Sequence, residues 1–150
     1  MMGGSFGGHM ANLLAVTTDR FEAIVTHASL WNLPAFVSTS DHPPLLRRVH
    51  GDPVEAAERY REQSPHQRAN KITTPMLVIH GNRDYQVPIS ESMSLWSDLV
   101  RHGVPAKFRY FPDGNHCVLK PGHIKVWYET CFAFLDRHVF GAEWKRPELL

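Results

Sequence analysis

The regular alternation of helix-like and strand-like segments along the 150 residues is the feature that most constrains the fold. Residues 75–80 (PMLVIH) form an unbroken apolar run that Gly81 follows. Such a run is typical of a strand covered on both faces, as strands are in a parallel sheet. Further strands are predicted at residues 21–28 and 106–111. The second of these alternates in polarity, so it is expected nearer the sheet edge.

Apolar residues at spacings of three and four predict the helices between these strands. They are expected at residues 9–17, 54–62, 90–102 and 122–138. Asp52 and Pro53 have the residue types that open a helix, whereas residues 29–53 are rich in proline and predict an irregular loop or lid. The alternation predicts an α/β fold in which right-handed crossovers join a parallel sheet with flanking helices.

The composition is that of one ordinary globular domain, with 43% hydrophobic and 21% charged residues. The 16 basic and 15 acidic residues leave no basic face for nucleic acid. Cys117 and Cys131 lack the spacing of a disulfide framework or a zinc knuckle. The start of the chain has no secretion signal and no stretch is apolar enough to cross a membrane, so a cytoplasmic location is expected.

A G-x-S-x-G pattern at the start of the chain, Gly3-Gly4-Ser5-Phe6-Gly7, predicts a sharp turn that presents Ser5 as a nucleophile. A serine needs a base to remove its proton and a carboxylate to orient that base. Asp84 (HGNRD) and His116 (DGNH) follow the next two predicted strands after residue 28. Their order along the chain, Ser, Asp, His, is that of hydrolases with this turn. A catalytic triad of Ser5, Asp84 and His116 is therefore predicted.

Other histidines carry no such motif. His80, His102, His123 and His138 lie at element ends or on helices, and we assign them no catalytic role. A metal site is a weak alternative, because His116 and His123 are seven residues apart with only Cys117 and Asp113 nearby. No metal and no cofactor is expected.

Four segments resemble the catalytic domain of the prolyl oligopeptidase family of serine peptidases, nearest to its acylaminoacyl-peptidase and dipeptidyl-aminopeptidase branches. They are GGSFGGHMAN, FEAIVTHASLWNL, SPHQRANKITTPMLVIHGNRDYQVPISES and FPDGNHCV. The resemblance implies an α/β-hydrolase fold. It also implies that Ser5 is the nucleophile, that His116 is the general base and acid, and that Asp84 orients His116.

The resemblance further implies roles for residues around the triad. The backbone N–H of Phe6 would donate to the oxyanion, Val87 would line the pocket for the residue before the scissile bond, and Trp31 would form a further wall. Gln86 stands where the family often has Arg, which removes a charged contact to the substrate. His9 stands where Tyr is common and is expected to pack.

The resemblance covers nearly the whole chain, which would correspond to the second half of the catalytic domain, from the nucleophile turn onward. The family's earlier strands, its second oxyanion donor and its β-propeller would lie outside residues 1–150. One sheet edge is then expected to be uncovered, which favours association of copies. The isolated chain is expected to have little or no peptidase activity.

Three functions stay open on the sequence. The first is a serine peptidase segment that acts on short peptides or acyl-amino acids through an acyl-enzyme. The second is an esterase or other acyl hydrolase with the same triad, since the fold does not fix the substrate. The third is a non-catalytic fragment with a structural or interaction role.

Overall fold

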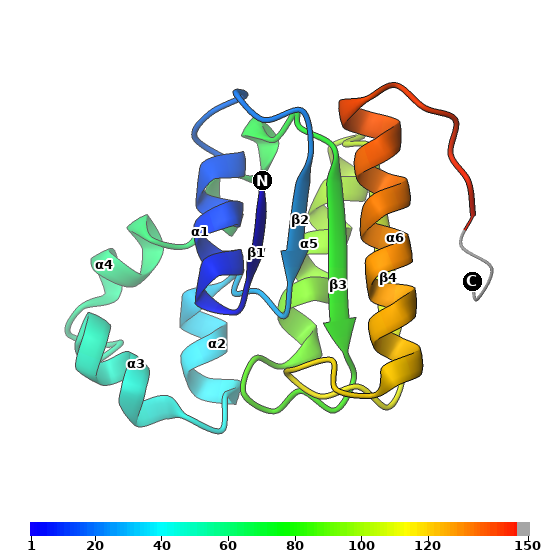
Figure 1. Ribbon diagram of the computed structural model, residues 1–150. Coiled ribbons are helices and arrows are strands. Elements are labelled where there is room, and N and C mark those ends of the chain that lie inside the picture. Colours follow the sequence, from blue (N-terminus) through cyan, green and yellow to red (C-terminus); the bar gives the residue numbers. More distant parts are fainter. Residues whose placement is uncertain (147–150) are drawn as a thin grey trace.

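A four-stranded parallel sheet forms the centre of the computed structural model, which describes residues 1–146 (Figure 1). Its order in space is the order along the chain, β1-β2-β3-β4. The strands are β1 (Met2–Gly4), β2 (Ile24–His27), β3 (Met76–Gly81) and β4 (Ala106–Phe111). The predicted parallel α/β class is confirmed, and β4 lies at an edge as expected.

Helices cover both faces of this sheet, with α1 and α5 on one face and α6 on the other (Figure 1). None of the helices within residues 1–146 has the length and apolarity needed to cross a membrane. The helices are α1 (Phe6–Ala15), α2 (Leu33–Thr39), α3 (Pro43–His50), α4 (Ala57–Glu62), the 3₁₀ helix η1 (Pro65–Lys71), α5 (Ile89–Arg101) and α6 (Pro121–Val139).

Strand β3 shows why the run at residues 75–80 is apolar throughout. Successive side chains of a strand point to opposite faces. Met76 and Val78 pack with the residues of α1 and α5, whereas Leu77 and Ile79 pack with those of α6. All four are fully buried, so neither face of the strand can accept a polar residue at these positions.

The first strand, β1, includes two glycines of the serine turn, Gly3 and Gly4. Met2 pairs with Val25 and Gly4 with His27, in parallel register with β2. The amino group of Met1 donates to the carbonyl of Ala23 at 2.8 Å, which anchors the strand at its beginning. The strand therefore leads directly into Ser5. Its other side pairs with no strand of residues 1–146.

The expectation of an irregular loop at residues 29–53 is wrong, because this segment contains α2 and α3. Pro34, Pro43 and Pro44 stand in the first turns of these helices, where the missing N–H has no helical partner to lose. The side chain of Asn32 caps α2 by accepting from the N–H of Ala35. Proline-rich composition thus marked two helix starts here.

The next helix begins later than predicted. Asp52 does accept a hydrogen bond from the N–H of Val54 at 2.8 Å, but residues 53–56 form turns and α4 starts at Ala57. The helices α2, α3 and α4 enclose a small apolar cluster that is separate from the clusters on the two faces of the sheet. Its buried members are Leu30, Leu33, Phe36, Val37, Leu46, Tyr60 and Val87.

Candidate active site

Ser5 occupies the turn between β1 and α1 in a strained backbone conformation. Its φ of 55° and ψ of −123° lie in a region that residues with side chains rarely adopt. The N–H of Ser5 donates to the carbonyl of His27 at 2.9 Å, and its carbonyl accepts from the N–H of His9 at 3.0 Å. These bonds fix the turn, so the strain places the hydroxyl at the carboxyl end of the sheet.

The glycines of the turn allow close backbone contact. A Cβ on Gly3 would lie 2.1 Å from the carbonyl oxygen of Gly7, and one on Gly8 would lie 2.5 Å from Cβ of Ser29. Such distances exclude any side chain. The pattern therefore lets the first turn of α1 fold back onto β1 and β2.

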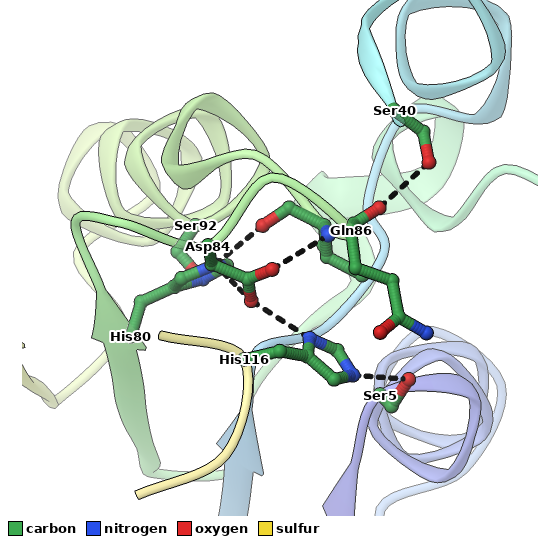
Figure 2. A network of polar contacts seen from close by, with 8 residues as sticks. Ser5, Ser40, His80, Asp84, Gln86, Ser92 and His116 are labelled. Atoms are coloured by element: carbon green, nitrogen blue, oxygen red, sulfur yellow. Dashed lines mark hydrogen bonds and ion pairs between the residues drawn. The ribbon is translucent and has the colours of Figure 1, made fainter. Parts of the chain in front are cut away.

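Two hydrogen-bond contacts join the three residues predicted to form a triad, with His116 between Ser5 and Asp84 (Figure 2). Oγ of Ser5 is 2.9 Å from Nε2 of His116, and Nδ1 of His116 is 2.8 Å from Oδ2 of Asp84. Because an ionised carboxylate only accepts, Nδ1 carries the proton and Nε2 is free to accept from the serine hydroxyl. Ser5, His116 and Asp84 thus form one continuous chain of hydrogen bonds.

Backbone hydrogen bonds hold the loop that carries Asp84 against the loop that carries His116. The N–H of Asn82 donates to the carbonyl of Phe111 at 2.9 Å, and the N–H of Arg83 donates to that of Gly114 at 2.8 Å. The separation of the acid and the base is thus fixed by the main chain as well as by their own contact.

The carboxylate of Asp84 is buried and fully engaged. Its Oδ1 accepts from the N–H of Val87 at 2.8 Å, while Oδ2 faces His116 and His80. Burial raises the pKa of Asp84, but the hydrogen bonds from His116, His80 and Val87 outweigh it and lower this pKa to about 2. Asp84 is therefore an anion at neutral pH.

His80, to which we assigned no catalytic role from the sequence, contacts Asp84. Its ring is fully buried, with Nε2 at 2.7 Å from the carbonyl of Val87 and 3.2 Å from Oδ2 of Asp84. Ser92 of α5 lies 2.6 Å from its Nδ1. The available signal was one polar residue at the end of an apolar strand, four positions before the acid.

A small apolar cavity of about 90 Å³ opens on one side of Ser5. Val87, for which the resemblance implies a place in a substrate pocket, lines it together with Phe6 and Gln86. Ser40 donates to the carbonyl of Gln86 at 2.7 Å, so the connection between α2 and α3 is tied to the loop of Asp84 (Figure 2). The remaining lining residues are Ser5, Leu30, Phe36, Ser40, His42, Leu45 and Leu46.

Trp31 does not form a wall of this cavity, so the expectation for this residue is wrong. Its side chain is fully buried in the core beneath α1 and α5. A buried indole N–H needs an acceptor, and Nε1 donates to Oδ2 of Asp98 at 2.8 Å. The neighbouring Leu30 lines the cavity instead.

A larger cavity of about 400 Å³ lies on the other side of Ser5, between β1, β2 and α6. His116, Cys117 and Trp127 line it together with His27. Burial lowers the pKa of His27 to about 4, so its ring is neutral at physiological pH. This side of the site is therefore largely apolar and uncharged.

Phe6 is the first residue of α1, and N–H groups of a first helical turn have no acceptor within the helix. The helix dipole also favours negative charge at this end. The Phe6 N–H, to which the resemblance assigns the oxyanion contact, is one of these groups. His9, in the same helix, is buried and packs its ring 5.5 Å from that of Phe6.

Within the described part of the chain, no three His, Cys, Asp or Glu side chains are grouped so that they could hold a metal ion. His116 and His123, the pair considered for a metal site, have different partners. His116 faces Asp84, while Nε2 of His123 lies 3.2 Å from Asp113.

Comparison with known proteins agrees with this geometry. The prolyl oligopeptidase family matches residues 1–141. Dipeptidyl-peptidase 5 of Aspergillus fumigatus is 34% identical over 149 residues, which are 97% of this chain and 20% of that protein. Dipeptidyl-peptidase 5 of Porphyromonas endodontalis is 36% identical over 142 residues, 91% of this chain and 20% of that protein. This chain thus spans about a fifth of the length of these relatives.

The solved structure of the acylaminoacyl peptidase of Pyrococcus horikoshii superposes with a TM-score of 0.87 at 26% identity. The match covers 98% of this chain and 24% of that one. The strand order, the strained serine turn and these similarities agree. The chain therefore belongs to the prolyl oligopeptidase family of serine peptidases, with an α/β-hydrolase fold.

Proposed function

We propose that this chain carries the catalytic triad of a serine peptidase that cleaves short peptides or acyl-amino acids through an acyl-enzyme. The observation that supports the proposal most is the unbroken hydrogen-bond chain from Ser5 through His116 to the buried Asp84. The relatives are named dipeptidyl-peptidases and an acylaminoacyl peptidase, which supports a short or blocked substrate.

In the proposed reaction, Ser5 Oγ attacks the scissile carbonyl while His116 Nε2 takes its proton. The protonated His116, stabilised by the anionic Asp84, then delivers this proton to the leaving amine. Water, activated by the same nitrogen, hydrolyses the acyl-enzyme. The Phe6 N–H stabilises the oxyanion at the positive end of α1.

The cavity of about 90 Å³ next to Ser5 suggests which kind of side chain the substrate carries just before the scissile bond. Apolar side chains such as Phe36 and Val87 dominate its lining, and Gln86 contributes an uncharged amide. We propose that it accepts a small apolar side chain. An acidic or basic side chain would lose its hydration there without gaining a counter-ion.

We also propose that the 150-residue chain alone turns over peptides slowly. Among the described residues we assign one oxyanion donor, the N–H of Phe6, and the lack of one donor typically costs about 10²- to 10³-fold in turnover. Covalent labelling is therefore a better test of the triad than peptide turnover, because one addition to Ser5 is enough to give a signal.

The test is labelling of the purified chain with a fluorophosphonate, compared with Ser5→Ala. Labelling of the parent chain that is absent in Ser5→Ala supports an assembled triad. A folded parent chain that does not label would favour the non-catalytic reading.

Matched aminoacyl nitroanilide and aminoacyl ester substrates, given to a longer protein containing this chain, separate the two enzymatic readings. Cleavage of both supports the peptidase. Cleavage of the ester alone would replace it by the esterase reading.

A further inference from the structure

We propose that His80, held by Ser92, is a positioning residue that fixes the carboxylate of Asp84 for its contact with His116. This proposal rests on the function proposed above for the triad. It assigns a role to two buried residues, His80 and Ser92, that take no part in the proposed reaction.

The position of His80 is set by a buried strand in the interior of the sheet. His80 is the fifth residue of β3, whose six residues are all buried. It pairs with Tyr110 of β4, and the four residues before it pair with both β2 and β4. Asp84, by contrast, lies in the irregular connection between β3 and α5, at residues 82–88. A connection of this kind needs contacts from outside to hold a side chain in one orientation.

The ring of His80 supplies two such contacts through one nitrogen. Nε2 lies 2.7 Å from the carbonyl oxygen of Val87 and 3.2 Å from Oδ2 of Asp84. Both oxygens are acceptors, so Nε2 must carry a proton. The N–H of Val87 in turn donates to Oδ1 of Asp84 at 2.8 Å. His80, Val87 and Asp84 thus form a closed ring of contacts.

Ser92 fixes the ring of His80 from the opposite side. Its Oγ lies 2.6 Å from Nδ1, and its side chain is fully buried in α5 (Figure 2). With Nε2 protonated in the neutral ring, Nδ1 has a free lone pair and the hydroxyl of Ser92 donates to it. This contact sets the tautomer of His80 and prevents a flip that would turn a carbon toward Asp84.

The consequence concerns which oxygen of Asp84 meets His116. Oδ1 is occupied by Val87 and Oδ2 is shared between His80 and His116. Without His80, the carboxylate of Asp84 can rotate. Val87, which donates its N–H to this carboxylate, also loses the contact between its carbonyl and His80. A displacement of about 1 Å at a catalytic group can cost about 10²-fold in rate.

The test uses the full chain with substitutions His80→Leu, His80→Gln and Ser92→Ala. Thr130→Val is the matched control, because it removes a buried hydroxyl of α6 that donates only to the carbonyl of Val126. Two quantities are measured: the rate constant of fluorophosphonate labelling, and the ¹⁵N shifts of the His116 ring, which report the nitrogen that carries the proton.

We expect His80→Leu to slow labelling by about 10- to 100-fold and to mix the two tautomers of His116. Ser92→Ala should show the same effects to a smaller extent. His80→Gln, whose amide can donate toward Val87 and Asp84, should recover part of the rate. Thr130→Val should change neither quantity.

Unchanged labelling and an unchanged His116 tautomer in folded His80→Leu would overturn the proposal. If His80→Leu does not fold, Ser92→Ala decides, since it removes a single hydroxyl: unchanged values in both measurements would then overturn it. A parent chain that never labels contradicts the proposed function alone, because the tautomer of His116 still tests the role of His80.

Discussion

Gly81 and Gly114 lie in direct backbone contact beneath the active site. A Cβ on Gly81 would lie 2.4 Å from the carbonyl oxygen of Gly114. Gly81 ends β3 just before the loop of Asp84, and Gly114 lies two residues before His116. The distance between the acid and the base therefore depends on two positions that have no side chain.

The first prediction is that Gly81→Ala separates the two loops. We expect it to lower the free energy of unfolding by roughly 1–3 kcal/mol, measured by urea denaturation. Fluorophosphonate labelling of the folded fraction should also fall, because Asp84 and His116 move apart.

Gly122→Ala is the matched control, since a Cβ there meets nothing within 4 Å and the residue is helical. It should raise stability by up to about 1 kcal/mol and leave labelling unchanged. Equal behaviour of the two variants would show that the contact between Gly81 and Gly114 does not constrain the site.

The second prediction concerns Asp84→Asn. The amide keeps the shape of the carboxylate, but it neither carries the charge that stabilises protonated His116 nor enforces a proton on Nδ1. We expect labelling at neutral pH to fall by about 10³- to 10⁴-fold with the fold retained. The rate constant of labelling measures the loss of reactivity, and circular dichroism shows whether the fold is retained. A loss of less than about tenfold would contradict the assignment of Asp84 as the orienting acid.

The proposed triad could be predicted because its signals are local. Ser5 lies in a glycine pattern, and Asp84 and His116 each follow a strand whose apolar residues are visible in the sequence. Parallel strands end at one edge of a sheet, so order and placement sufficed to bring these residues together.

Other parts of the site depend on long-range partners that no local pattern reveals. The use of His80 requires Ser92 of α5 and the carbonyl of Val87. Trp31 follows β2, where a pocket residue is plausible, yet Asp98 at 67 positions further along draws its indole into the core. A proline can either open a helix or break one. At residues 33–50 prolines open α2 and α3, whose apolar side chains pack together in one cluster.

The third prediction is a loss of stability in mild acid. Burial lowers the pKa values of His9 and His27 to about 4 each. In the unfolded chain these rings bind protons below about pH 6.5, whereas in the folded chain they stay neutral until about pH 4. The unfolded state therefore binds more protons between these values, and stability decreases as the pH falls from 6.5 to 4.

Each ring contributes on the order of 3 kcal/mol to this loss. Urea denaturation at several pH values across the window measures the slope. His27→Phe, which removes one titrating ring beside an open cavity, should make the slope shallower. An equal slope in this variant would show that His27 is not the source.

The fourth prediction concerns Glu91, which holds the segment before α2. Its Oε2 accepts from the N–H groups of Trp31 and Asn32, both at 2.7 Å. Glu91→Leu leaves both donors without an acceptor and should lower the free energy of unfolding by about 2–5 kcal/mol. Glu91→Gln retains a carbonyl oxygen and should have a smaller effect. Urea denaturation followed by tryptophan fluorescence measures both, and equal losses would show that packing rather than hydrogen bonding is responsible.

The fifth prediction is that copies of this chain associate through the free edge of β1. Its outer side pairs with no strand among residues 1–146, Met2 is 46% exposed, and the nearby face of α6 exposes Tyr128 and Phe132. An open strand beside apolar side chains favours pairing with a second chain. Light scattering after size exclusion should therefore show a mass that rises with concentration.

Met2→Lys tests the edge directly, because a charged side chain on an edge strand opposes pairing with another chain. We expect this variant to shift association to higher concentration. Val54→Lys, at a site 84% exposed between α3 and α4, introduces the same charge away from the sheet and should leave association unchanged. If both substitutions act equally, net charge rather than the β1 edge controls association, and a monomer at all concentrations would exclude the edge as a contact between copies.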